Sequence, residues 1–254
     1  MNWDPQQYSR FAGQRLRPAL DLIARIPLEH PSTVVDLGCG TGNVTRVLRG
    51  RWPHADIVGV DGSPQMLAEA KKTKGEIGWE LVDVAAWNPP KKFDLVFSNA
   101  ALHWLDDHPA LFARLSGKVA AGGVLAVQMP RNFAAPSHTL MHELASSPPW
   151  RDALLKLLRS QPVLSPEAYY GLLAPNTRSL DIWETEYLQI LEGGNPVAEW
   201  TKGTWLAPLL AALAPDARAA FEAEYRLRVA RAYPRQRDGK TLFPFRRLFI
   251  VAVF

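Results

Sequence analysis

The fold of this chain is decided at residues 34–43, which read Val34-Val35-Asp36-Leu37-Gly38-Cys39-Gly40-Thr41-Gly42-Asn43. An apolar run ends in three alternating glycines, and a helical pattern with apolar residues at Val44, Val47 and Leu48 follows it. Glycine permits the tight turn and the close approach of a ligand in such a loop. The start of the next helix presents unpaired backbone N–H groups to that ligand. The stretch therefore predicts a strand, a ligand-binding turn and a helix.

Two further apolar runs each end in an aspartate. Residues 56–60 lead to Asp61, and residues 79–82 lead to Asp83. A carboxylate at Asp61 can accept hydrogen bonds from both hydroxyls of a ribose, and the carboxyl ends of parallel strands meet at one edge of a sheet. Asp83, beside Val84, can accept the exocyclic amino group of an adenine. Each aspartate taken singly also suits a helix cap or a solvated loop, but their conjunction with the glycine turn predicts a bound nucleoside with a small tail.

Strands alternate with helices through the first half of the chain, which is typical of a doubly wound α/β fold with a mostly parallel sheet. An amphipathic helix over Asp4–Ile26, with Phe11, Leu16, Leu20 and Ile23 at helical spacing, comes first. Ser63-Pro64 opens a helix after the second strand. The remaining predicted elements are strands over Thr33–Leu37, Asp56–Val60, Trp79–Val82, Phe93–Ser98 and Val124–Met129, and a helix over Pro109–Val119.

The pattern changes after Pro130. Residues 136–159 have a helical pattern that is broken by Ser147-Pro148-Pro149, and residues 196–233 are mostly helical. Strands are predicted over Asp181–Leu191 and Arg247–Phe254. We therefore expect an α/β core with its leading helix over residues 1–130. Residues 131–254 are expected to form a helical cover over the ligand site, interleaved with the last two strands of the sheet.

Composition limits the possible functions. The chain has 254 residues, a net charge of +4 and one cysteine, Cys39, which excludes an internal disulfide and a cysteine-based zinc site. We predict no metal site. The N-terminus lacks the pattern of a signal peptide, and no apolar run is long enough to cross a membrane, so we expect a cytoplasmic protein without a membrane partner. The mild basic excess, densest at residues 231–240, could serve nucleic acid but suits a small anionic substrate equally well, and we do not expect nucleic acid as a partner.

The ordered motifs VVDLGCGTGN, VGVDGSPQML, LVDVAAW and FDLVFSNAALHWL resemble those of class I S-adenosylmethionine-dependent methyltransferases. The resemblance implies a Rossmann-like sheet of seven strands with one antiparallel strand near the edge, and S-adenosylmethionine as cofactor. It implies that Gly38, Gly40 and Gly42, preceded by Asp36, lie under the methionine and ribose, and that Asp61 with Gly62 holds the ribose. Met66 would lie near the adenine, Asp83 and Val84 would contact its edge, and Asn99 and Ala100 would flank the sulfonium.

A narrower resemblance covers nearly the whole chain. WDPQQYSRFAGQRLRPALDLIARIPLE, NAALHWLDDH, GGVLAVQMPRNFAAPSH and FPFRRLFIVA resemble the family of enzymes that methylate trans-aconitate. This implies transfer of a methyl group to one carboxylate of a small polycarboxylate, with a monomethyl ester as product. The chain departs from that family at His103, where a glutamine is expected, and in its basic charge balance.

A polycarboxylate needs cations and donors around it, because unpaired charge is costly to bury, and arginine matches a carboxylate at two points. Arg131 and Asn132 follow the fifth strand, and His103 and Trp104 follow the fourth, where with Asn99 they would orient the acceptor. No catalytic base is predicted, because a carboxylate is already ionised at neutral pH. Further candidates are Tyr170, Arg246 of the pair Arg246-Arg247 before the last strand, and, for the cofactor's own carboxylate, Arg15 on the leading helix.

Three other interpretations stay open. The chain could methylate another acid, a phenol or a carbon, in which case His103 could serve as the base that such acceptors require. A nucleic-acid methyltransferase would need a basic, aromatic-lined track, and no Asn-Pro-Pro-Tyr-type motif for amino methylation follows the fourth strand. A non-catalytic protein that only senses the cofactor would share the glycine turn and both aspartates. The oligomeric state is not determined by the sequence.

Overall fold

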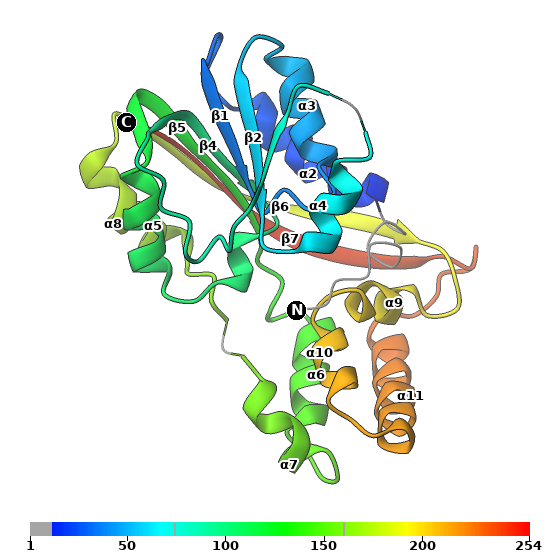
Figure 1. Cartoon of the computed structure of the whole chain (residues 1–254). Helices are drawn as coiled ribbons and strands as arrows, with labels where there is room; N and C mark the ends of the chain where they lie inside the picture. Colours follow the sequence, from blue (N-terminus) through cyan, green and yellow to red (C-terminus); the bar gives the residue numbers. More distant parts are fainter. Residues whose placement is uncertain (1–11, 74, 160) are drawn as a thin grey trace.

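Seven strands form one sheet in the order β3-β2-β1-β4-β5-β7-β6 (Figure 1). The computed structural model describes residues 12–73, 75–159 and 161–254, without the side chains of residues 12–15. β1 to β5 run parallel, and β7 runs antiparallel to both of its neighbours, β5 and β6. The strands are β1 (Thr33–Leu37), β2 (Asp56–Asp61), β3 (Gly78–Leu81), β4 (Phe93–Asn99), β5 (Val119–Pro130), β6 (Ser179–Leu191) and β7 (Thr241–Val253). The predicted mostly parallel, seven-stranded sheet is confirmed.

Helices cover both faces of this sheet, because successive strand residues point to opposite sides. Val34 and Ile57 pack under α2 and α3 on one face. Val35 and Val60 belong to the core under α5 and α8 on the other. The bounds of these helices, and of α4 beside β2 and β3, are α2 (Ala12–Ala24), α3 (Asn43–Arg51), α4 (Pro64–Ala70), α5 (His108–Ser116) and α8 (Pro166–Leu173). The sheet is thus doubly wound, as expected.

A group of five helices, which we call the helical cover, gathers beside the edge of the sheet at which β1, β2 and β4 end (Figure 1). These are α6 (Pro136–Ala145), α7 (Arg151–Leu154), α9 (Pro196–Lys202), α10 (Leu206–Ala211) and α11 (Pro215–Ala232). They share a core that includes Met141, Trp200 and Phe221, and Phe243 and Phe245 of β7 pack into it. The division of the chain at residue 130 stays a prediction. No helix in the described ranges is long and apolar enough to cross a membrane.

Three details of the sequence-based prediction are wrong. Val119 belongs to β5 rather than to a helix, because it pairs with Phe93 of β4. β7 begins at Thr241 rather than Arg247, since it pairs with β6 along its whole length. Leu20 is 43% exposed, and α2 instead buries Ala19 and Leu22 together with Ile23, whose burial the helical spacing predicts. The predicted start of the first helix, at Asp4, lies outside the described residues.

Gly38 is the glycine whose replacement the turn tolerates least. Its φ is +73°, and an added Cβ would lie 2.2 Å from the Cβ of Ala101. We expect Gly38→Ala to lower the free energy of unfolding by at least about 2 kcal/mol, from left-handed strain plus overpacking. Chemical denaturation monitored by circular dichroism measures this. Gly50→Ala is the control, because an added Cβ there meets nothing within 4 Å; equal stability of the two variants would contradict the assignment.

Candidate functional site

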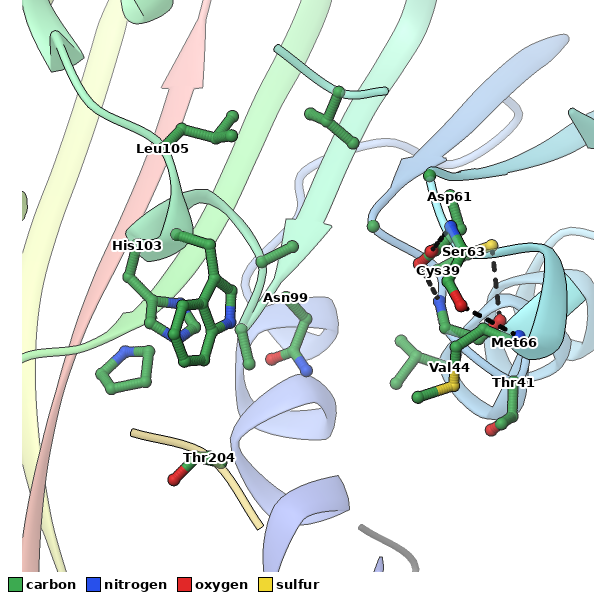
Figure 2. A pocket seen from close by; sticks show the side chains of 18 of the residues that line it. Cys39, Thr41, Val44, Asp61, Ser63, Met66, Asn99, His103, Leu105 and Thr204 are labelled. Carbon is green, nitrogen blue, oxygen red and sulfur yellow. Dashed lines mark hydrogen bonds between the residues drawn. The ribbon is translucent and has the colours of Figure 1, made fainter. Parts of the chain in front are cut away.

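A cavity of about 510 Å³ opens where the carboxyl ends of β1, β2 and β4 face the helical cover. Figure 2 shows Cys39, Thr41 and Asp61 on one side of it and Asn99 and His103 on the other. A volume of this size suits a ligand of the nucleoside class. The lining residues are Asp36, Gly38, Cys39, Gly40, Thr41, Asn43, Val44, Asp61, Gly62, Ser63, Met66, Asp83, Val84, Asn99, Ala100, Ala101, His103, Trp104, Leu105, Pro130, His138, Trp200, Thr201, Thr204, Trp205, Phe245 and Arg247.

The glycine turn is anchored on the tip of β2. The backbone N–H groups of Gly38 and Cys39 both donate to the carbonyl oxygen of Val60, at 2.8 Å and 3.0 Å. Gly40 has a φ of +55°, and no atom lies within 4 Å of the position that a Cβ would take. The turn therefore leaves open space above Gly40, where a ligand can approach the backbone. Gly42 does not line the cavity: its φ is +76°, and an added Cβ would lie 2.4 Å from the ring of Trp79.

Asp61 joins the turn to the next helix. Its carboxylate accepts hydrogen bonds from the backbone N–H groups of Gly40 and Ser63, each at 2.8 Å (Figure 2). Each carboxylate oxygen retains lone pairs for a further donor. Ser63 then caps α4 by accepting a hydrogen bond from the backbone N–H of Met66 at 3.3 Å. The acid, the turn and Met66 are thus held at one wall of the cavity.

Asp36 is a buried acid beneath the turn. It is 2% exposed, and its Oδ2 accepts a hydrogen bond from the hydroxyl of Thr45 at 2.6 Å. Burial raises the pKa of Asp36 to about 7, an effect that the Thr45 hydroxyl partly offsets and the nearby charge of Asp61 reinforces. A bound cation would favour the ionised form of this carboxyl.

The tips of β3 and β4 complete this half of the cavity. Asp83 is exposed and its Oδ1 accepts a hydrogen bond from the backbone N–H of Ala85 at 2.9 Å, while Val84 is buried. After β4, Ala100 has a left-handed φ of +53°, and its backbone N–H donates to the carbonyl oxygen of Gln128 at 2.9 Å. The Oδ1 atom of Asn99 is buried and has no hydrogen-bond partner in the described part of the chain. An unsatisfied acceptor at a cavity wall is what a ligand donor would satisfy.

The other half of the cavity is largely aromatic. Trp104 after β4 and Trp205 before α10 stack with ring centroids 4.7 Å apart, and the ring of Phe133 meets Trp205 edge-on at 5.3 Å. Thr201 and Thr204 lie beside this wall, and Figure 2 shows Thr204 across from Asn99. The wall contributes apolar surface to the cavity, which suits burial of an apolar part of a ligand.

Arg247 brings a permanent positive charge to this half. It lies on β7, is only 3% exposed and lines the cavity. Its Nη1 donates to the side-chain oxygen of Gln128 at 3.2 Å, and its guanidinium carbon lies 4.8 Å from the ring centroid of Phe245. A buried guanidinium at a cavity wall can receive a carboxylate through two parallel hydrogen bonds. This side chain is the functional candidate that sequence reasoning passed over in favour of Arg246.

His103 and His138 are two buried imidazoles in the same half. Burial, and next the charge of Arg247, lower the pKa of His103 well below its ordinary value. Burial also lowers the pKa of His138, to about 4. Both rings are therefore neutral near pH 7. The Nδ1 of His103 is buried without a hydrogen-bond partner among the described residues, so it can bond to a ligand as a neutral group.

The cavity brings together most of the residues predicted for the cofactor: Asp36, Gly38, Gly40, Asp61, Gly62, Met66, Asp83, Val84, Asn99 and Ala100. The side chain of Arg15 lies outside the described part, so its predicted role stays a prediction. Of the residues predicted for the acceptor, His103 and Trp104 line the cavity.

The other predicted acceptor residues lie elsewhere. Arg131, Asn132 and Arg246 line a second hollow of about 240 Å³. There Arg131 forms an ion pair with Glu184 at 2.7 Å. The side chain of Tyr170 on α8 is 62% exposed and lines neither space. The separation of Arg246 from Arg247 follows from strand geometry, because neighbouring residues of β7 point to opposite faces.

The sheet order and the glycine turn held by an acid at the tip of β2 define an S-adenosylmethionine-dependent methyltransferase. A family model described as a methyltransferase domain matches residues 9–174. The chain is 47% identical over 251 residues to the trans-aconitate 2-methyltransferase of Azoarcus sp. strain BH72, with 99% of this chain and 98% of that protein covered. It is 45% identical to the protein of that name from Streptomyces avermitilis, covering 99% and 96%. The chain belongs to the trans-aconitate 2-methyltransferase family.

Solved structures share the fold at low sequence identity. A phosphoethanolamine N-methyltransferase 2 of Haemonchus contortus, solved with S-adenosyl-L-methionine, has a TM-score of 0.58 and 18% identity, covering 97% of this chain and 56% of that chain. The YcgJ protein of a Bacillus has a TM-score of 0.55 and 15% identity, covering 93% and 98%. At these identities the likeness supports the fold alone.

The raised pKa of Asp36 predicts a pH-dependent stability difference. Between pH 4 and pH 7 the folded protein keeps a proton that the unfolded chain loses, so the free energy of unfolding falls as pH rises through this window. Asp36→Asn removes that fall. Without ligand, the free energy of unfolding of the variant minus that of the wild type should be larger at pH 8 than at pH 4 by on the order of 3–4 kcal/mol. Denaturation at both pH values measures it, with exposed Asp152→Asn as control; a pH-independent difference would contradict the assignment.

Proposed function

We propose that this enzyme transfers the methyl group of S-adenosylmethionine to one carboxylate of trans-aconitate or a similar small polycarboxylate, forming a monomethyl ester. The proposal is supported by the names of the full-length relatives and by one structural observation, the buried Arg247 in the aromatic half of the cavity. The substrate in this proposal is an anion, and no nucleic acid takes part.

The residues at the turn suit the cofactor. In this proposal the Asp61 carboxylate, already oriented by Gly40 and Ser63, accepts the ribose hydroxyls. Met66 and Val84 contact the adenine, and Asp83 accepts a hydrogen bond from the adenine amino group. The unpartnered Oδ1 of Asn99 accepts a hydrogen bond near the methionine part. A ligand with a positively charged sulfur would favour the ionised form of Asp36 below the turn, and the carboxylate would in turn favour that ligand.

Arg247 holds an acceptor carboxylate that does not react. Pairing the reacting carboxylate with a guanidinium would lower its nucleophilicity, whereas a paired neighbouring carboxylate orients the substrate at no such cost. Trp104 and Trp205 border the acceptor on its apolar side. The two ends of the cavity then carry opposite charges: acids lie at the cofactor end and Arg247 at the acceptor end.

The reaction requires alignment of the acceptor oxygen with the methyl group, and it requires no proton transfer. When bound, S-adenosylmethionine supplies a methyl group on a positively charged sulfur, which it would give to one oxygen of the acceptor carboxylate while leaving as the neutral thioether. The chain's residues therefore have to hold this oxygen in line with the sulfur–methyl bond. No proton moves, because the carboxylate is ionised at neutral pH. The chain contributes alignment and exclusion of water.

The lowered basicity of His103 favours a carboxylate over acceptors that need a base. Burial and the nearby charge of Arg247 lower the pKa of His103 well below its ordinary value. An imidazole of such low basicity is a weak base for a phenol or a carbon acid. It can still hydrogen-bond an acceptor without adding charge. This argues against the alternative in which His103 removes a proton.

The ribose role of Asp61 makes a prediction about cofactor affinity. We expect Asp61→Ala to weaken S-adenosylmethionine binding by on the order of 1–3 kcal/mol, because hydrogen bonds to a charged group are lost and the turn loosens. Isothermal titration calorimetry measures this. Asp56→Ala changes an exposed acid at the opposite end of the same strand and serves as control. Unchanged affinity in the Asp61 variant would rule out the ribose role.

The acceptor role of Arg247 predicts a loss of substrate binding. We expect Arg247→Lys to raise the KM for trans-aconitate about tenfold or more, because lysine lacks the two-point fork. S-adenosylmethionine affinity should change less than twofold. Transfer of labelled methyl groups to a panel of small organic acids measures both ester formation and KM. Arg131→Ala, in the second hollow, is the comparison variant. A larger rise of KM in that variant would assign the acceptor site to the second hollow. If the enzyme forms no ester with any polycarboxylate, the proposed function is wrong.

A further inference from the structure

Gln128 lies next to Arg247 in the interior of the sheet. Its side chain, on β5, is 0% exposed. Its Oε1 accepts the hydrogen bond from Nη1 of Arg247 at 3.2 Å, whereas its Nε2 is buried and has no hydrogen-bond partner among the described residues. A buried side-chain amide whose nitrogen makes no hydrogen bond costs free energy on folding. The hydrogen bond to Arg247 gives a reason for a glutamine at this position despite that cost.

The strand register fixes how the two side chains meet. Gln128 pairs with Phe249, and Pro130 pairs with Arg247, across the antiparallel β5–β7 ladder. Gln128 and Arg247 are therefore diagonal neighbours on one face of the sheet, within reach of long side chains. Phe245 follows on the same face of β7, and its ring centroid lies 4.8 Å from the guanidinium carbon. The guanidinium thus contacts an amide oxygen of β5 and an aromatic ring of its own strand.

We propose that Gln128 is a positioning residue, which acts on the acceptor through Arg247. Its amide oxygen orients the guanidinium and, being neutral, adds no negative charge next to it. A carboxylate at the same place would hold the guanidinium more strongly and would also cancel its charge. Gln128 therefore sets the preference for an anionic acceptor. This inference rests on the proposed function, because it assumes that Arg247 binds an acceptor carboxylate.

The test compares acceptors of different charge in Gln128→Glu and Gln128→Met. In the Gln128→Glu enzyme we expect the KM for trans-aconitate to rise about tenfold or more, since the new carboxylate competes for Arg247. The KM for its dimethyl ester, which carries one carboxylate, should change less than threefold, because only the reacting carboxylate remains. Gln128→Met keeps the length without an oxygen acceptor, and we expect a smaller loss in the same direction. Calorimetry should give wild-type affinity for S-adenosylmethionine in both variants.

Gln189→Glu is the matched control. Gln189 is also a buried glutamine of the sheet, 7% exposed on β6, and it does not line the cavity. The control separates the cost of burying a carboxylate from an effect on Arg247. Equal changes for the triacid and the diester, or a wild-type KM in both Gln128 variants, would overturn the inference. If Gln128→Glu does not fold, the Gln128→Met comparison alone decides. Absence of ester formation by the wild-type enzyme would instead overturn the proposed function, and this inference with it.

Discussion

The organisation of the site depends on the attachment of the glycine turn to the tip of β2. Two backbone N–H groups of the turn donate to the carbonyl oxygen of Val60, and a third donates to the carboxylate of Asp61. These bonds hold the turn open above Gly40. They also orient Asp61 before any ligand binds, so little ordering is left for the binding step.

The same sheet edge that carries this attachment brings the two halves of the cavity together. β1, β2 and β4 end at it in parallel, which brings Asp36, Asp61 and Asn99 to the same cavity. Antiparallel β7 enters from the opposite direction and brings Arg247 to the same cavity. The cavity is thus lined by acids at the strand tips and by the guanidinium of Arg247 on β7, which are groups of opposite charge. Burial keeps His103 and His138, which also line the cavity, neutral.

The helical cover and the segment before α10 contribute further side chains to the wall of the cavity. Trp200, Thr201 and Trp205 come from α9 and from the segment before α10, and they face the tips of the parallel strands. Tyr225 of α11 supports them from behind, because its hydroxyl donates to the carbonyl oxygen of Ser137 at 2.8 Å and bonds to Thr201 at 3.0 Å. The aromatic wall is therefore tied to α6 and α11 and does not stand alone.

The parallel part of the sheet and the residues that line the glycine-turn side of the cavity could be predicted from the sequence by itself. Those features depend on local patterns: apolar runs of strand length, glycines where φ is positive, and aspartates at strand ends. Only the tertiary structure decided which arginine faces the cavity. Arg246 and Arg247 are adjacent in the chain and therefore point to opposite faces of β7, and the register in which β7 pairs with β5 and β6 decides which of the two faces the cavity. The partner of Arg247, Gln128, lies on a different strand, and such long-range pairing leaves no local pattern in the sequence.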